Sequence, residues 1–255
     1  MFKRFIKYKN FIPSKLRRFL RKIYFNRVIA YFENLIFFNR VKFLNLEIND
    51  KDKIISNKTK QLIRHSLYEY YELDAISKLR YFDNDFIDLG SSIGLTSYSV
   101  SQKLFGKKII VVEPVIDYLN FSKKILDENQ NEIVFLNKAI YYDNEVAYIE
   151  KGVSNLSSSI NSLSGDAVEA TSLSEIISLN NLKEFNMLVD IEGYGFQLLF
   201  EEEDALQNCR KIIIDEKFNT EFTYQIIEEQ LNKLGFKLVY FQNAWNGIVL
   251  GAVKT

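Results

Sequence analysis

The sequence predicts an α/β fold: a mostly parallel seven-stranded sheet with helices on both faces and an antiparallel hairpin at the carboxyl terminus. Three observations indicate this architecture. From Asp85 onward, short apolar runs alternate with amphipathic helical segments, a pattern typical of a parallel sheet covered on both faces. Glycine-rich punctuation follows the first of these runs. The last two runs are joined by a tight turn at 243–246, so they must be antiparallel.

The bulk composition is that of a folded, neutral protein. The chain has 255 residues, of which 47% are hydrophobic and 26% charged, and its formal net charge is zero. These values are typical of a globular domain that is large enough to bury a core without disulfides or metals. Because the net charge is zero, the protein as a whole is not built to attract nucleic acid, and we expect no nucleic-acid partner.

Cysteine and histidine are nearly absent, which excludes several kinds of site. Cys209 is the only cysteine and His65 the only histidine. No internal disulfide can form, and zinc sites made from these two residue types are excluded. His65 lies far from any nucleophile motif, which argues against Ser-His-Asp catalysis. Because we find neither a signal peptide nor an apolar segment long enough to cross a bilayer, we expect a cytoplasmic protein.

Residues 1–40 form a basic extension. Ten Lys and Arg residues precede the first acidic residue, Glu33. Pro13 and Ser14 are typical of a helix start, with Ser14 as N-cap, and the apolar residues that follow recur at helical spacing with basic residues on the other face. The sequence therefore predicts a basic amphipathic helix. It could dock on the main domain or on a second copy, giving a homodimer, or it could lie on an anionic membrane surface.

Residues 41–255 form the predicted main domain, and 41–84 lead into its sheet. The elements that we expect follow in chain order. They are a strand at 41–48, a turn at 49–52, one or two helices within 58–79, strands at 86–89, 108–112 and 133–136 with helices at 95–104 and 116–129 between them, a hairpin at 139–150, strands at 186–191 and 211–214, a helix at 222–234, and strands at 236–241 and 247–253. The segment 154–165, rich in serine and asparagine, predicts a loop, either a lid or a plain solvated connection.

A glycine-rich turn follows the first strand of the parallel sheet. In an open α/β sheet, ligands bind beyond the carboxyl ends of the strands. Glu113 ends the next strand, where a carboxylate can hydrogen-bond the hydroxyls of a ribose. We therefore expect a nucleoside-containing ligand to be bound by Glu113 and by residues of the turn. The turn residues are Asp88, Gly90, Ser91, Ser92 and Gly94.

The composition of this turn favours S-adenosylmethionine over a dinucleotide. Dinucleotide turns need a middle glycine that makes room for a pyrophosphate, and Ser92 occupies that place. Asp88 would repel a phosphate, whereas it would attract the cationic sulfonium and amino groups of S-adenosylmethionine. A dinucleotide site and a ligand-free Rossmann-type domain remain the alternatives.

Further acidic residues end the later strands of the sheet. Asp190 and Glu192 lie two apart, so on an extended chain they share one face. They could bind hydroxyls, orient the cofactor or act as a base, or one of them could simply cap the next helix. Asp215 and Glu216 end the following strand, and because adjacent residues point to opposite faces we expect only one, Glu216, to face the site.

Together these motifs resemble those of the FkbM family of methyltransferases. The matching segments, spread over about residues 65–255, are 68–72, 86–94, 112–114, 137–140, 189–193 and the acidic pair at 215–216. The resemblance implies a Rossmann-like class I methyltransferase fold, S-adenosylmethionine as cofactor with Asn137 among its binding residues, and methyl transfer to a hydroxyl of a sugar or natural product. The chain departs from the family pattern at Ser92, where Asn is usual, at Leu188, where Lys is usual, and at Gly195, where Glu is usual.

The resulting expectation is an O-methyltransferase, and we assign no residue to a metal site. A carboxylate of Asp190, Glu192 or Glu216 would take the proton of the attacking hydroxyl, and Asp190 would also contact the cofactor. The expected acceptor is a small molecule or a sugar hydroxyl in a surface glycan or glycolipid. The alternatives are a non-catalytic binding or assembly module and a nicotinamide-dependent oxidoreductase.

Overall fold

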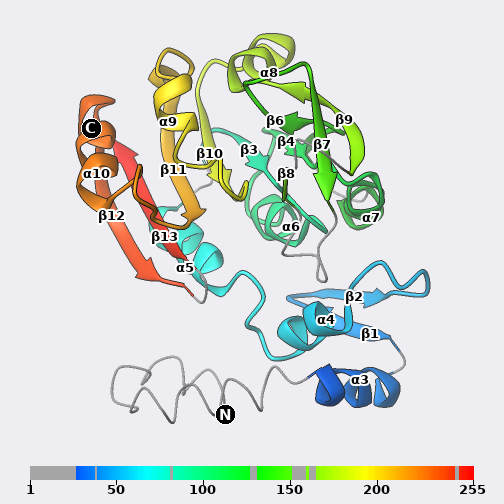
Figure 1. Ribbon diagram of the computed structural model, residues 1–255. Helices are drawn as coiled ribbons and strands as arrows, with labels where there is room; N and C mark the ends of the chain where they lie inside the picture. Colours follow the sequence, from blue (N-terminus) through cyan, green and yellow to red (C-terminus); the bar gives the residue numbers. More distant parts are fainter. Residues whose placement is uncertain are drawn as a thin grey trace, which may run out of the picture. The chain divides into compact units, whose positions relative to one another are not determined.

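The computed structural model describes residues 27–37, 39–80, 83–126, 131–150, 159–160, 165–244 and 247–255 (Figure 1). These residues form two compact units that divide after Tyr70. Residues 41–70 thus group with the helix that precedes them, whereas the sequence-based division placed a boundary at residue 40. The predicted amphipathic helix that starts at Ser14 and the Ser/Asn-rich segment 154–158 lie outside the described residues.

The first unit consists of a hairpin and two helices, of which the second contacts both the first helix and the hairpin. It consists of α3 (Arg27–Ile36), β1 (Arg40–Phe43), β2 (Leu46–Asn49) and α4 (Asn57–Arg64). The single strand expected at 41–48 is therefore wrong: β1 and β2 pair antiparallel, with Val41 opposite Ile48. Leu44 takes a φ of 51°, a left-handed conformation that a continuous strand cannot contain, and this turns the chain back on itself.

A buried ion pair holds the segment after the hairpin to α4. The Nζ atom of Lys60 lies 2.7 Å from Oδ2 of Asp50, and both side chains are almost completely buried. The Asp50 carboxylate also accepts the N–H groups of Ile54 and Ile55. Because a buried charge is tolerated only when it is paired and hydrogen-bonded, this pair fixes the path from β2 into α4.

The second unit contains the predicted seven-stranded sheet. Its strands are β3 (Asp85–Leu89), β4 (Lys108–Val112), β5 (Glu132–Leu136), β10 (Phe185–Val189), β11 (Cys209–Glu216), β12 (Phe236–Asn243) and β13 (Ile248–Lys254), and their order is β12-β13-β11-β10-β3-β4-β5. Strands β5, β4, β3, β10 and β11 are parallel to one another. Strand β13 runs antiparallel to both of its neighbours, β11 and β12. The expected mostly parallel seven-stranded sheet, including its antiparallel carboxyl-terminal strands, is confirmed.

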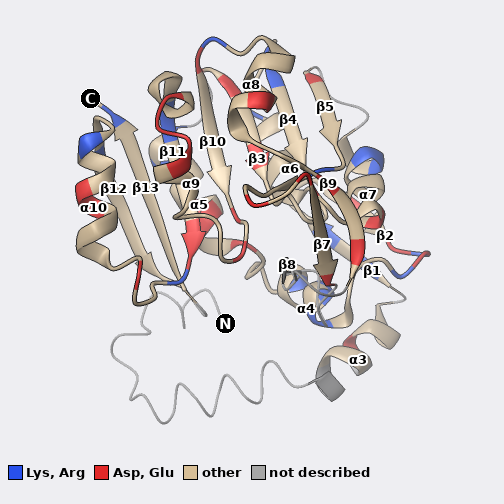
Figure 2. Ribbon diagram, turned by 45° about the horizontal axis from the view of Figure 1, so that its top comes forward, with Lys and Arg blue, Asp and Glu red and all other residues tan. Residues whose placement is uncertain are grey.

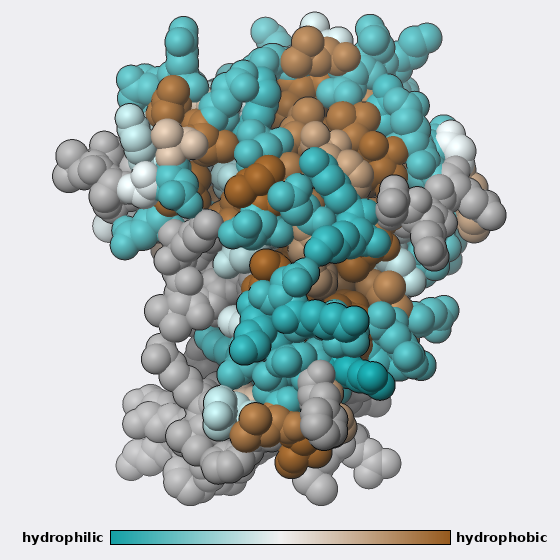
Figure 3. Space-filling model, turned by 90° about the vertical axis from the view of Figure 1, so that its right-hand side faces the viewer, coloured by the Kyte–Doolittle hydropathy of each residue, from teal (hydrophilic) through white to brown (hydrophobic). Residues whose placement is uncertain are grey.

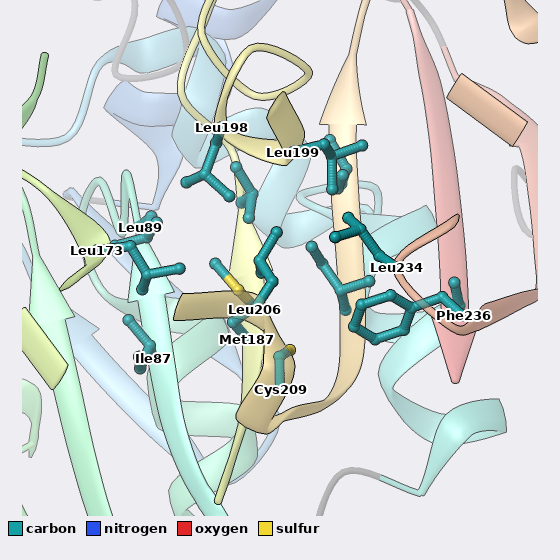
Figure 4. Close-up of a cluster of buried hydrophobic side chains, with 14 of the residues drawn as sticks. Ile87, Leu89, Leu173, Met187, Leu198, Leu199, Leu206, Cys209, Leu234 and Phe236 are labelled. Carbon is teal, nitrogen blue, oxygen red and sulfur yellow. The ribbon is translucent and has the colours of Figure 1, made fainter. Parts of the chain in front are cut away.

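Helices cover both faces of this sheet (Figure 1). On one face, a continuous apolar cluster joins the strands to α8 (Leu173–Asn180), α9 (Leu198–Glu201) and α10 (Tyr224–Lys233). Figure 4 shows side chains of this cluster, among them Ile87 and Met187 from neighbouring strands and the fully buried Cys209. The other face carries α5 (Tyr70–Leu79) and α6 (Leu95–Ser101), while α7 (Ile116–Leu126) packs beside α6 and β5.

A second, smaller sheet corrects the hairpin expected at 139–150. Its strands are β6 (Ala139–Ile140), β7 (Val146–Glu150), β8 (Ser159–Ile160) and β9 (Asp166–Thr171), in the order β6-β9-β7-β8. Strands β6 and β7 do not pair with each other, because β9 lies between them, parallel to β6 and antiparallel to β7. Strand β9 and helix α8 were not predicted. No helix in the described ranges has the length and apolar character needed to cross a bilayer.

Candidate active site

The turn between β3 and α6 passes directly against the end of β10. Gly90 has a φ of 81°, and a Cβ atom built on it would lie 2.0 Å from the carbonyl oxygen of Asp190. Gly94 has a φ of 74°, and a Cβ there would lie 2.5 Å from Oγ of Ser122 on α7. Only glycine fits either position, since both the backbone conformation and the space exclude a side chain. These two glycines bring the ends of β3 and β10 and the start of α6 close together.

Glu113 and Asn137 fix the neighbouring strand ends. One carboxylate oxygen of Glu113 accepts the N–H of Ser92 at 2.8 Å, and the other accepts the N–H of Val115 at 2.8 Å. Burial raises the pKa of Glu113 to about 7. Asn137 donates its side-chain amide to the carbonyl oxygens of Glu113 and Pro114. Both predicted ligand-binding residues thus lie at the carboxyl edge of the sheet, where they also hold the turn in place.

The same turn contains buried polar atoms that have no partner. Asp88 is fully buried, and Oγ of Ser97 donates to its Oδ2 atom. Its Oδ1 atom, Oγ of Ser91 and Oγ1 of Thr96 are also buried, and none of them has a hydrogen-bond partner. An unsatisfied buried polar group costs about 1–3 kcal/mol, so three on one short segment call for an explanation. A ligand that carries amino and carboxylate groups would satisfy them, and burial already raises the pKa of Asp88 to about 6.

Asp190 and Asp215 lie side by side just beyond the ends of the neighbouring strands β10 and β11. Val189 pairs with Ile214, so the next residues, Asp190 and Asp215, occupy one row and one face. Burial raises the pKa of Asp190 well above its ordinary value, and the negative charges of Asp215 and Asp88 raise it further. Figure 2 shows acidic residues at the end of β11 and in the segment that follows β10. An acid with so high a pKa takes up protons readily, which suits a group that exchanges protons with a substrate.

Asp215 forms a carboxyl pair that sequence reasoning missed. Its side chain hydrogen-bonds the carboxyl group of Glu72 on α5, and burial together with this neighbour raises the pKa of Asp215 to about 10. At neutral pH the pair therefore holds a proton between its two carboxyl groups. Glu72 lies in one of the segments that match the family, but only the fold brings it to the end of β11. Helical spacing on α5 alone gives no sign of this contact.

Glu216, the acid favoured by the sequence, lies at the site but is fully engaged with the backbone. One of its oxygens accepts the N–H groups of Gly193 and Gly195, at 2.8 and 3.2 Å, and the other accepts the N–H of Lys217 at 2.8 Å. A Cβ atom at Gly195 would lie 3.3 Å from the Glu216 carboxylate, so the absence of a side chain there leaves room for this contact. Glu216 thus shapes the segment that follows β10.

The remaining predicted acid is more exposed. The Oε1 atom of Glu192 lies 3.8 Å from Nζ of Lys217, and both side chains are largely open to solvent. In the same segment, the ring of Tyr194 contacts that of Tyr141, the residue just after β6. The two rings lie edge to face, with their centroids 5.6 Å apart. In the part of the chain that the structure describes, no group of three or more acidic, cysteine or histidine residues could hold a metal ion.

Comparison with known proteins gives matches in structure only. No protein-family model and no curated protein sequence matches the chain. Among solved structures, precorrin-6y C5,15-methyltransferase from Geobacter metallireducens GS-15 is 15% identical, with a TM-score of 0.44 over 74% of this chain and 89% of that one. Fibrillarin from Aeropyrum pernix, with natively bound S-adenosyl-L-methionine, is 12% identical, with a TM-score of 0.45 over 71% of this chain and 74% of that one. Magnesium protoporphyrin IX methyltransferase from Synechocystis PCC 6803, with bound SAM, is 11% identical, with a TM-score of 0.42 over 72% and 78%.

Proposed function

We propose that the second unit is an S-adenosylmethionine-dependent methyltransferase that acts on a hydroxyl group. The observation that carries this proposal is the set of buried polar atoms without a partner at Asp88, Ser91 and Thr96, on a glycine turn at the carboxyl edge of the sheet. An aspartate there attracts a cationic, phosphate-free nucleoside and repels a dinucleotide. When bound, the cofactor supplies a methyl group on a positively charged sulfur.

In this proposal Asp88 and Glu113 bind the cofactor. Asp88 offers its free Oδ1 atom to the amino group of the ligand, and ionisation of the buried carboxyl is favoured by the positive charge that it meets. Each oxygen of Glu113 already accepts one backbone N–H and keeps a second lone pair for a ribose hydroxyl. Asn137 supports Glu113 through the backbone of the same strand end.

We assign the general base to Asp190. Its pKa lies well above the ordinary range in the free protein, and a nearby cation lowers that pKa toward neutrality, where a base is most effective. Asp215 lies beside it, shares a proton with Glu72, and is one of the acidic groups that raise the pKa of Asp190. Glu216 acts as a positioning residue, because it holds the segment that carries Glu192 and Tyr194 through the N–H groups of Gly193 and Gly195.

The acceptor that we propose is a sugar hydroxyl of a surface glycan or glycolipid. This choice follows from the family resemblance, and it agrees with the aromatic pair of Tyr141 and Tyr194, of which Tyr194 follows Glu192 in the same segment, since sugar rings commonly lie against aromatic faces. Alignment of the hydroxyl and removal of its proton by Asp190 are the tasks that this proposal gives to the protein.

Calorimetry with S-adenosylmethionine tests the cofactor. We expect binding to the wild type, a loss of at least about tenfold for Asp88→Asn, and no loss for Asp85→Asn. Asp85 is a matched control because it lies on the same strand, at the amino end, where its Oδ1 atom accepts the N–H of Lys108. A wild-type protein that binds no S-adenosylmethionine would overturn the proposal.

Transfer of labelled methyl groups to an extract of glycans and glycolipids tests the base. Asp190→Asn should lower turnover by about 10²–10⁴-fold, far more than it lowers cofactor affinity. Glu192→Gln, a change of the same size on the same segment, should have a much smaller effect because Glu192 is exposed. Full cofactor binding without turnover on any acceptor would favour a non-catalytic module instead.

A further inference from the structure

The first unit contains a cavity that plays no part in the proposed methyl transfer. It encloses about 730 Å³ and is lined by residues of α3's end, the hairpin and the end of α4. A volume of this size accommodates a ligand of several tens of atoms. Apolar side chains of Val41 and Ile48 contribute to its wall, and the exposed face of the hairpin contributes charged ones.

Positive charge dominates this lining. Arg40, Lys42 and Arg64 carry three positive charges, against one negative charge on Glu47. Arg40 and Lys42 lie on the exposed face of β1, and within the described ranges neither of them forms an ion pair. Asn49, which is neutral, stands opposite Arg40 in the hairpin, and Glu47 stands opposite Lys42. Arg40 is therefore the cation more available to an anionic ligand, and Lys42 lies on the same exposed face of β1.

The third cation holds the wall together. The guanidinium group of Arg64 donates to the carbonyl oxygen of Arg40 at 3.1 Å and to Oδ1 of Asn34 at 3.2 Å, and it lies 5.0 Å from the centre of the Phe37 ring. These contacts join α3, β1 and α4 before any ligand binds. A site whose walls are already fixed loses less entropy when it takes up a ligand.

Phe37, which lines the cavity, belongs to a run of exposed apolar side chains. Along α3 and just beyond it, Tyr31, Leu35, Ile36 and Phe37 are each more than half exposed. Brown surface beside teal surface around α3 is visible in Figure 3. Large apolar residues next to a cluster of cations are typical of protein segments that enter the interfacial layer of a membrane. The ten basic residues that precede Glu33 in the sequence give this part of the chain the same charge preference.

We propose that this cavity binds the phosphate headgroup of an anionic phospholipid. Arg40 and Lys42 contact the phosphate, and the exposed side chains of α3 enter the acyl boundary beside it. The inference is independent of the methyltransferase proposal, because all of the residues that it uses belong to the first unit.

Flotation of the full-length protein with vesicles of phosphatidylcholine and phosphatidylglycerol tests this site. The pocket variant is Arg40→Gln with Lys42→Gln, and the matched control is Lys51→Gln with Lys53→Gln, which removes the same charge from exposed positions of the same unit outside the cavity. We expect the pocket variant to lower the membrane partition coefficient about tenfold and the control to lower it by less than about threefold. Circular dichroism of both variants should match that of the wild type.

Two results would overturn the proposal. Equal losses in the two double variants would show that diffuse surface charge, and not the cavity, binds the membrane. Calorimetric binding of inorganic phosphate by the wild type, lost in the pocket variant, with no flotation on anionic vesicles would show that the cavity takes a free anion instead of a lipid headgroup.

Discussion

Replacing Gly90 by alanine should separate the ends of β3 and β10. The added Cβ atom would lie 2.0 Å from the carbonyl oxygen of Asp190, whereas carbon and oxygen atoms rarely approach closer than about 3.3 Å. The chain must therefore move by more than an ångström. That movement breaks the hydrogen bond from the N–H of Asp190 to the carbonyl oxygen of Leu89, which now measures 2.9 Å.

The size of the effect follows from three contributions. A positive φ costs an alanine about 1–2 kcal/mol, a lost backbone hydrogen bond costs about 1 kcal/mol, and crowding in a packed interior costs about 1–3 kcal/mol. We expect Gly90→Ala to lower the free energy of unfolding of the second unit by about 3–6 kcal/mol. Binding of S-adenosylmethionine should be lost with it.

Gly106→Ala separates the conformational contribution from the steric one. Gly106 has a φ of 63°, but a Cβ atom there would have no atom within 4 Å. This variant should lose only about 1–2 kcal/mol, from the unfavourable φ alone. Urea unfolding followed by the fluorescence of Trp245, the only tryptophan in the sequence, measures both variants. Equal losses of stability in the two variants would refute the close approach of β3 and β10 at this turn.

Three further predictions test other parts of the structure. Because the pKa of Asp88 rises from 3.8 to about 6 on folding, this carboxyl should make stability fall as pH rises through this window, and affinity for the cationic cofactor should rise up to about tenfold per pH unit below pH 6. Asp88→Asn should remove this contribution and leave that of Glu113, whose pKa is about 7; a binding profile unchanged by the substitution would contradict the assignment. Lys60→Met should lower the free energy of opening of the first unit, measured by hydrogen exchange, by about 3–5 kcal/mol, because it leaves the buried Asp50 carboxylate without its cation. The double variant with Asp50→Asn should recover part of this loss rather than add to it. Ser172→Ala, which removes the N-cap of α8, should lower the free energy of unfolding in urea by about 1 kcal/mol. Ser178→Ala, on the exposed side of the same helix, should lower it by less than about 0.5 kcal/mol.

The parallel sheet could be predicted because its strands are buried on both faces. Strand β4 was expected at 108–112 and occupies Lys108–Val112, and the strand expected at 86–89 is β3. Such strands read as continuous apolar runs, which single-sequence patterns detect well. The turn after β3 was equally visible, because a positive φ at Gly90 and Gly94 requires glycine.

Pairing between distant segments could not be predicted in the same way. The residues of β6 and β7 surround a plausible turn, and a hairpin was the simplest local reading of them. Strand β9, which separates the two, lies beyond a segment rich in serine and asparagine, and its alternation is short and mixed in polarity. Local pattern carries no information about such an insertion, because the pairing is fixed by packing around Val168 and Ala147.

The sequence predicted which acidic residues lie at the candidate site, but not which of their side chains face it. Alternation along β11 showed that only one of Asp215 and Glu216 shares the face of Asp190. Which of them does so depends on the register between β10 and β11, and that register pairs Val189 with Ile214. The contact between Asp215 and Glu72 joins positions 143 residues apart, so no local signal in the sequence could have revealed it.

The burial of Cys209 makes the reactivity of its thiol a measure of how often the core opens. The thiol is fully enclosed by the apolar cluster of Figure 4, and burial raises its pKa, so in the native state it is neither accessible nor appreciably ionised. Since the sequence holds no other cysteine, any modification of the chain by a thiol reagent has to wait until that cluster opens. The rate of labelling therefore follows the opening of the core face of the sheet in unmodified protein, with no engineered probe and no denaturant.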